Sequence, residues 1–172
     1  MVYPECYGYN TIHADESYNN MHDLKARPAR ESDLPVILEL LADDVLGQQR
    51  EQIESPIPAH YYAAFDAIHA DKNQLLAVFE YQYHLVGCLQ LSFIPGLSRQ
   101  GIWRGQIEAV RISAEHRGTG FGTEMIGWAI EECRARKCGL VQLTSDKTRS
   151  EAIRFYQSLG FQPSHEGFKL FL

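Results

Sequence analysis

The stretch that decides the fold is residues 107–122, Ile-Glu-Ala-Val-Arg-Ile-Ser-Ala-Glu-His-Arg-Gly-Thr-Gly-Phe-Gly. It opens with the alternating pattern of a strand, which has a period of two residues. That period divides the side chains between two faces, with Glu108, Val110 and Ile112 on one and Ala109 and Arg111 on the other. A polar turn then leads into three glycines, after which apolar residues recur at helical spacing over 125–133. The glycines therefore lie where a strand gives way to a helix.

This position suits a bound phosphate, because backbone N–H groups converge there and the start of a helix carries a positive dipole. The spacing excludes two common phosphate loops. A P-loop needs Gly-Lys-Ser/Thr, whereas Gly122 is followed by Thr123 and Glu124. A dinucleotide fingerprint needs Gly-x-Gly-x-x-Gly, whereas the glycines here are Gly118, Gly120 and Gly122. A tight strand-to-helix turn without a ligand stays open as the alternative.

Two motifs resemble those of one family. Residues 117–122, Arg-Gly-Thr-Gly-Phe-Gly, resemble the Arg/Gln-x-x-Gly-x-Gly/Ala signature of the GCN5-related N-acetyltransferases, the GNAT family. Residues 152–161, Ala-Ile-Arg-Phe-Tyr-Gln-Ser-Leu-Gly-Phe, are similar to that family's Ala-x-x-Phe-Tyr-x-x-x-Gly-Phe motif. The resemblance extends from near Leu24 to the end of the chain, and two motifs at the family's separation are more specific than either alone. It implies a fold that binds coenzyme A.

The resemblance also implies which residues bind acetyl-CoA, the acyl donor. They are Val110, Arg111, Ile112, Arg117, Gly118, Thr119, Gly120, Phe121, Gly122, Thr123 and Arg149. In the family the loop amides hold the pyrophosphate, and the central strand offers backbone groups, here those of Val110 and Ile112, to the pantetheine arm. Arg149 stands where many relatives carry Asn, and an arginine can pair with a phosphate instead.

Two residues are candidates for acid–base catalysis. An alkylamine, with a pKa of about 10, arrives protonated at neutral pH, so a base is useful. Glu108 is the candidate base, at the position where several relatives place a catalytic carboxylate, and Tyr156 is the candidate acid for the departing thiolate. A salt-bridged surface glutamate and a core aromatic residue are the alternatives. No cysteine is paired with a histidine at a recognisable spacing, which favours direct attack in a ternary complex over an acyl-enzyme.

These features predict an N-acetyltransferase that moves the acetyl group of acetyl-CoA to a primary amine. The acceptor, a small-molecule amine or a peptide amine, is not identified, because the pocket implied by the resemblance, residues 48–62 and 93–103, carries no diagnostic motif. The alternative is a non-catalytic acyl-CoA-binding or sensing module with the same fold. No Cys/His/Asp spacing indicates a metal site.

The order of the patterns predicts an α/β (α+β) domain with a mixed, mostly antiparallel central sheet and helices on both faces. Strands are expected at about Leu24–Arg27, Leu75–Glu80, His84–Phe93, 107–112 and Leu140–Thr144, with closing strands at Phe161 and Phe168–Leu172. Helices are expected to begin at Leu34, near Tyr61, at Gly120 and at Arg149, with Ser32-Asp33 as a helix cap and Gly139 as a helix stop. The resemblance adds a V-shaped splay between two central strands.

Composition and charge are typical of one globular domain, with 172 residues of which 45% are hydrophobic and 22% charged. A net charge of −6 without a basic cluster argues against nucleic acid as a partner. No apolar run reaches the roughly 18 residues of a membrane span, and the start shows no secretion signal, so a cytoplasmic location with reduced cysteines is expected. Residues 1–22 lack periodicity and are predicted to be an N-terminal extension of a domain over 23–172. A homodimer stays open.

Overall fold

The computed structural model describes residues 23–43, 45–48 and 50–172, so the predicted extension, residues 1–22, lies outside the described part. Its centre is a five-stranded sheet in the order β1-β2-β3-β4-β5. The strands are β1 (Lys25–Pro28), β2 (Gln74–Tyr81), β3 (His84–Pro95), β4 (Trp103–Ile112) and β5 (Cys138–Leu143). The first three pairings are antiparallel, and the pairing of β4 with β5 is parallel.

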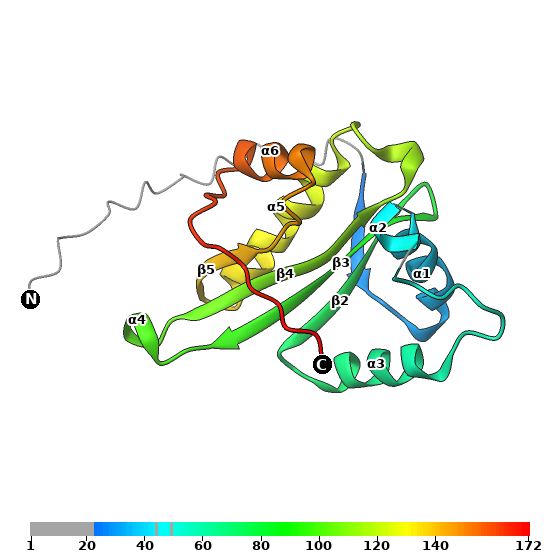
Figure 1. The fold of residues 1–172 in the computed structure, drawn as a ribbon, viewed down its shortest axis with the longest axis horizontal. Helices are drawn as coiled ribbons and strands as arrows, with labels where there is room; N and C mark the ends of the chain where they lie inside the picture. Colours follow the sequence, from blue (N-terminus) through cyan, green and yellow to red (C-terminus); the bar gives the residue numbers. More distant parts are fainter. Residues whose placement is uncertain (1–22, 44, 49) are drawn as a thin grey trace, which may run out of the picture.

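Helices cover both faces of this sheet (Figure 1). They are α1 (Leu34–Ala42), α2 (Val45–Gln48), α3 (Ala59–Ala70), α4 (Ser98–Gly101), α5 (Phe121–Ala135) and α6 (Ser150–Ser158), with 3-10 turns at Glu31–Asp33 and Ala114–His116. Successive residues of the strands point to opposite faces of the sheet and pack in two separate hydrophobic cores. Phe79, Leu91 and Ile107 pack with α5, whereas Val78 and Cys88 pack with α1 and α3. The predicted class, the mostly antiparallel order and the helices on both faces are confirmed.

A bulge in β4 overturns the simple alternation expected there. Ala109 has φ 51°, a left-handed conformation that is costly for a residue other than glycine. The pairing with β3 changes register at this point, because Glu108 lies opposite Gln90 but Arg111 lies opposite Cys88. The extra residue reverses the face of everything that follows it. Val110 and Ile112 therefore pack in the α5 core together with Ile107, and not on the face of Glu108.

The same strand opens away from its parallel neighbour. Pairing between β4 and β5 ends at Ile107 and Leu143, so residues 108–112 of β4 continue without a partner in β5. Strand β5 itself ends at Leu143, and the bulge at Ala109, of a kind that bends and twists a strand, follows just beyond Ile107. The V-shaped splay expected from the resemblance is present.

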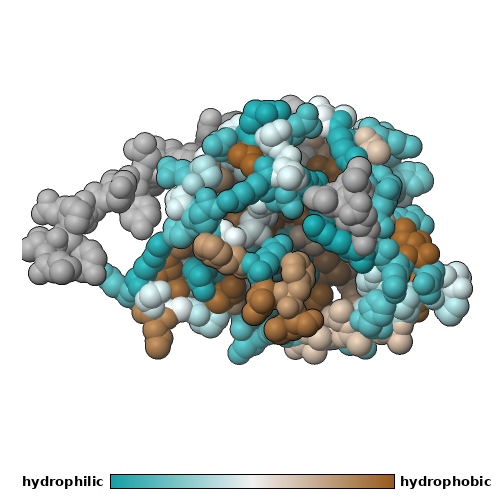
Figure 2. Space-filling model, in the orientation of Figure 1, coloured by the Kyte–Doolittle hydropathy of each residue, from teal (hydrophilic) through white to brown (hydrophobic). Residues whose placement is uncertain are grey.

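The closing strands expected at Phe161 and Phe168–Leu172 do not form, and the chain runs from Gly160 to its end without regular structure. Phe168, Leu170 and Phe171 are almost fully exposed. Figure 2 shows apolar surface where the C-terminal end lies in Figure 1. The strand propensity of this segment does not suffice to form a strand. Strands are stabilised by side chains of a neighbouring strand, and this segment pairs with none of the five strands.

The predicted stop of the long helix at Gly139 is also wrong. The helix α5 ends at Ala135, and Lys137, with φ 59°, takes the left-handed position that often follows a helix. Gly139 lies in β5, where a Cβ would come within 2.9 Å of Ile102 Cδ1. Close packing, and not helix termination, explains the glycine.

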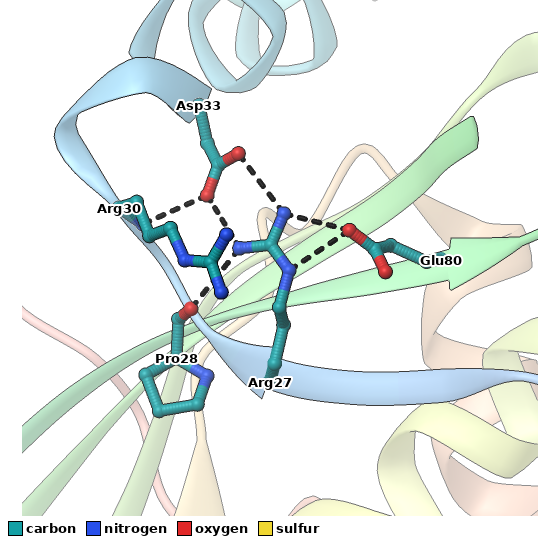
Figure 3. A network of polar contacts seen from close by, with 5 residues as sticks. All are labelled: Arg27, Pro28, Arg30, Asp33 and Glu80. Atoms are coloured by element: carbon teal, nitrogen blue, oxygen red, sulfur yellow. Dashed lines mark hydrogen bonds and ion pairs between the residues drawn. The ribbon is translucent and has the colours of Figure 1, made fainter. Parts of the chain in front are cut away.

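Asp33, expected to cap α1, instead joins a charged network across β1, β2 and the turn before α1 (Figure 3). Its carboxylate accepts hydrogen bonds from Arg27 Nη1 at 2.6 Å and from the backbone N–H of Arg30 at 2.7 Å. Arg27 Nε also donates to Glu80 Oε1 at 2.8 Å. One guanidinium thus holds two carboxylates from separate elements.

We expect Asp33→Asn to lower the free energy of unfolding by about 1.5–3 kcal/mol at neutral pH, the range for hydrogen bonds to charged groups. The Arg27 guanidinium lowers the pKa of Asp33 below its ordinary value. A depressed folded-state pKa contributes stability that is present above the ordinary pKa of about 4 and lost as pH falls through the folded value. The gap between variant and wild type should therefore close in acid. Urea unfolding at pH 7 and pH 3 measures it, with exposed Asp66→Asn as the control, and an equal gap at both pH values would contradict the charge account.

Candidate functional site

The loop between β4 and α5 exposes its backbone. Gly118 and Gly120 have φ values of 76° and 99°, conformations that glycine adopts without a steric cost. No atom lies within 4 Å of the place where a Cβ on Gly118 would stand. Helix α5 begins immediately afterwards, and the start of any α-helix presents N–H groups and a positive dipole. The arrangement is able to receive an anion.

Side chains on both sides hold this loop in shape. The His116 ring stacks on Phe121 with 5.2 Å between centroids and 10° between planes. His116 Nδ1 is 2.8 Å from Ser113 Oγ, and Thr119 Oγ1 donates to the backbone oxygen of His116 at 2.7 Å. The end of β4, the loop and the first residue of α5 are thereby linked. The sequence patterns placed Ser113 and His116 in a polar turn and did not predict these contacts.

The two family-like motifs of the sequence meet at Gly122. A Cβ on this residue would lie 3.1 Å from Phe155 Cζ and 3.2 Å from Ile112 Cδ1. The glycine therefore allows α6, the end of β4 and the start of α5 to pack together. Tyr156, the next residue on α6, is brought to the same region by this contact.

Arg117 joins the loop to the end of α1. Its Nη2 donates to the backbone oxygen and to Oδ2 of Asp43, both at 2.7 Å, and its Nε donates to the backbone oxygen of Ile112 at 3.2 Å. The side chain is about half exposed, at 48%. A phosphate bound at the loop would compete with Asp43 for this guanidinium.

The open edge of β4 carries two carbonyl groups that arginine side chains cover. The backbone oxygen of Val110 accepts from Arg111 Nη1 at 2.9 Å, and that of Ile112 accepts from Arg117. A strand-like ligand lying along this edge would exchange these side-chain contacts for its own hydrogen bonds.

Tyr156 is half-buried on α6, with the rings of Phe155 and Phe161 at 5.1 Å and 6.0 Å. Burial raises the pKa of Tyr156, and the positive charges of Arg149 and Arg111 act in the opposite direction. The phenol is therefore protonated at neutral pH and lies within electrostatic reach of two guanidinium groups. Arg149 is the residue directly before α6 and donates its backbone N–H to Asp146 at 3.0 Å.

Glu108 lies apart from this group. It is exposed on β4 opposite Gln90, on the sheet face that carries α1 and α3. Tyr156, by contrast, packs against the core that contains α5, on the other face of the sheet.

Two kinds of feature are absent from the described residues. Over 23–43, 45–48 and 50–172, no group of three or more His, Cys, Asp or Glu side chains is arranged to hold a metal ion. None of the helices in that part of the chain combines the length and the apolar character needed to cross a membrane.

Comparison with known protein families shows to which family the chain belongs. Residues 38–161 match the model of the acetyltransferase (GNAT) family. The chain belongs to the GNAT family. A segment of 63 residues is 33% identical to the aminoalkylphosphonate N-acetyltransferase of Salmonella typhimurium, covering 37% of this chain and 41% of that protein. The chain thus spans less than half the length of this curated relative.

Solved structures agree with the family. A transcriptional regulator from Bacillus halodurans C-125 superposes with a TM-score of 0.84 at 47% identity, covering 87% of this chain and 99% of that one. An acetyltransferase of Trypanosoma brucei superposes with a TM-score of 0.70 at 30% identity, covering 87% and 100%. The GNAT fold and membership expected from the two motifs are confirmed. The individual roles of the site residues stay predictions.

Proposed function

We propose that this GNAT protein transfers the acetyl group of acetyl-CoA to a primary amine by direct attack in a ternary complex. The observation that carries the proposal is the opening of β4 from β5 beyond Ile107 and Leu143, directly beside the glycine loop. The Salmonella relative is by name an N-acetyltransferase of aminoalkylphosphonates, which are amines. That similarity supports nitrogen as the acceptor atom.

The donor is assigned to the loop and the open edge of β4. The backbone of residues 118–123 and the Arg117 side chain would bind the pyrophosphate, and Val110 and Ile112 would bind the pantetheine arm. The left-handed glycines and the open space at Gly118 support this assignment, because a side chain there would fill the place of the phosphate. The backbone of Arg111, between Val110 and Ile112, and Arg149, beside α6, complete the proposed set.

The chemistry needs one base and one acid. The amine nitrogen forms a bond to the acyl carbon, the carbon–sulfur bond breaks, and the thiolate leaves. Glu108 takes one proton from the ammonium, directly or through a water, so that the neutral amine attacks. The nitrogen of the adduct then loses a second proton to solvent, and Tyr156 gives a proton to the sulfur. A phenol whose pKa burial raises is protonated at neutral pH and is regenerated from solvent after each turnover. Glu108 returns its proton to solvent in the same way.

A non-catalytic acyl-CoA-binding or sensing module is the second candidate. The observation that favours it is the 47% identity to a Bacillus halodurans protein described as a transcriptional regulator. Such a module would bind acetyl-CoA at the same loop without consuming it.

A screen of acceptor amines with acetyl-CoA, read as free thiol, separates the two candidates. We expect thiol release that depends on the amine and saturates with its concentration. Calorimetric binding of acetyl-CoA without amine-dependent thiol release from any of the small amines, amino acids, polyamines and peptides would favour the binding module.

We expect the deletion of residues 1–20 to leave the melting temperature and the coenzyme A affinity of the remaining chain unchanged. The reason is the absence of periodicity in that stretch and the domain-like start at Met21. Differential scanning calorimetry and titration calorimetry on the truncated chain measure both quantities. A large loss of either would show that the extension belongs to the domain. A cytoplasmic location also remains a prediction.

A further inference from the structure

We propose that the acceptor amine carries an anionic group of its own, and that Arg111 binds this anion while Glu108 receives the ammonium. The inference rests on the proposed acetyl transfer and names the class of its acceptor, a short aliphatic amine with a carboxylate, phosphonate or phosphate. It assigns to the Arg111 side chain a role distinct from that of its backbone.

The bulge in β4 brings Glu108 and Arg111 to the same face of the sheet. Glu108 lies opposite Gln90, and Arg111 lies opposite Cys88. Because residues 88 and 90 are two positions apart on β3, their side chains share one face, and so do those of Glu108 and Arg111. In a regular strand, residues 108 and 111 would face opposite sides. The bulge makes them neighbours on one face, roughly 7 Å apart along the strand.

This shared face is the acceptor side of the sheet. Cys88, directly opposite Arg111, packs among residues of α1 and α3, and Arg111 Nε lies 3.5 Å from the backbone oxygen of Leu41 in α1. The side chains of Val110 and Ile112, by contrast, point into the α5 core. The proposed donor and the proposed acceptor thus approach the open edge of β4 from different sides.

The two charges have opposite signs, and each suits one end of a zwitterionic amine. A carboxylate attracts the ammonium and can accept its proton. The Arg111 guanidinium already donates from Nε to Leu41 and from Nη1 to Val110, and an acidic group would bind to its other N–H groups or replace the Val110 contact. Arg111 is half-buried and Glu108 exposed, so the anion would occupy the more enclosed end. The positive charge of Arg111 acts on the pKa of Tyr156, against the larger effect of burial.

The phosphates of the donor do not account for this arginine. They are assigned to the glycine loop and Arg117, at the far end of the pantetheine arm, whereas the acyl end of that arm carries no charge. An anion bound by Arg111 on the face of Glu108 would therefore belong to the acceptor and not to the donor.

Matched acceptors test the proposal in the wild-type protein. β-Alanine and 2-aminoethylphosphonate each have a two-carbon chain with an acid group, whereas propylamine and 3-amino-1-propanol have none. We expect kcat/KM for the acidic amines to exceed that for the neutral ones by about 10- to 100-fold, the size of one charge-assisted contact. Equal kcat/KM for both groups would overturn this inference and leave acetyl transfer standing. Absence of transfer to every amine would overturn the proposed function itself, and this inference with it.

The variant Arg111→Gln assigns the effect to the residue. We expect the ratio of kcat/KM for the acidic amines to kcat/KM for the neutral amines to fall by about 10- to 100-fold, mainly through KM. A loss shared by both groups of amines would report on the Val110 contact of this side chain and not on an anion site. Arg111→Lys should restore part of the preference, because it keeps the charge without the fork. Arg154→Gln, an exposed arginine on α6, is the control that removes the same charge elsewhere. A preference for acidic amines that survives Arg111→Gln in a protein with wild-type melting temperature would contradict the assignment.

Discussion

Tyr156→Phe should lower kcat by about 10²–10⁴-fold, the loss typical of a missing general acid. The substitution keeps the ring and its contacts with Phe155 and Phe161, so the melting temperature and coenzyme A affinity should stay near wild type. Burial raises the pKa of Tyr156, which keeps the acid protonated through neutral pH. The fall of kcat at high pH should therefore begin only above the ordinary phenol pKa of about 10, and it should disappear or move in the variant.

Glu108→Gln separates the base from the acid. It should depress kcat/KM most at low pH, where the amine is most protonated and a base matters most. Amines of lower pKa should be partly spared. Wild-type kcat in Tyr156→Phe, with chemistry shown to be rate-limiting, would make Tyr156 a packing residue. If both variants are silent, positioning at the donor site is all that remains of the mechanism.

Gly120→Asp should reduce coenzyme A affinity below what titration calorimetry detects. The new carboxylate would stand at the loop where the pyrophosphate is proposed to bind, and like charges repel. Residue 120 also has φ 99°, so a side chain there costs roughly 1–2 kcal/mol of strain. Gly120→Ala carries the same backbone strain without the charge and is the matched variant. Binding that is lost in the aspartate variant and only weakened in the alanine variant would assign the effect to charge.

A second control places the same charge elsewhere. Gly167 lies in the C-terminal segment with no atom within 4 Å of a Cβ position, so Gly167→Asp should leave affinity unchanged. Unchanged coenzyme A binding in a folded Gly120→Asp protein would contradict the assignment of the loop.

The elements that could be predicted from the sequence are those with a regular period. The hairpin of β2 and β3, the stripe of α5 and the glycine loop follow from alternation, helical spacing and left-handed glycines. The bulge at Ala109 could not be predicted, because alanine gives no signal for φ 51°. Because of this one bulge, Val110, Arg111 and Ile112 lie on the faces opposite those expected relative to Glu108. Arg111 therefore shares a face with Glu108, and Val110 and Ile112 do not.

Contacts between residues far apart in the sequence could not be predicted either. The sequence placed Arg117 at a phosphate loop, but its contact with Asp43 joins residues 74 positions apart and leaves no local pattern. The strand predicted at Phe168–Leu172 is wrong for a related reason. The segment has strand-forming residues, but it pairs with no strand of the sheet. Local propensity predicts elements, and tertiary pairing decides which of them form.

Mass spectrometry of amines incubated with ¹³C-labelled acetyl-CoA and the full chain tests the central claim most directly. The account predicts a labelled N-acetyl amide formed in equal amount to free thiol, much reduced in Tyr156→Phe and absent in Gly120→Asp. A protein that binds acetyl-CoA but leaves the label on the thioester, or releases it as acetate without forming an amide, would contradict it.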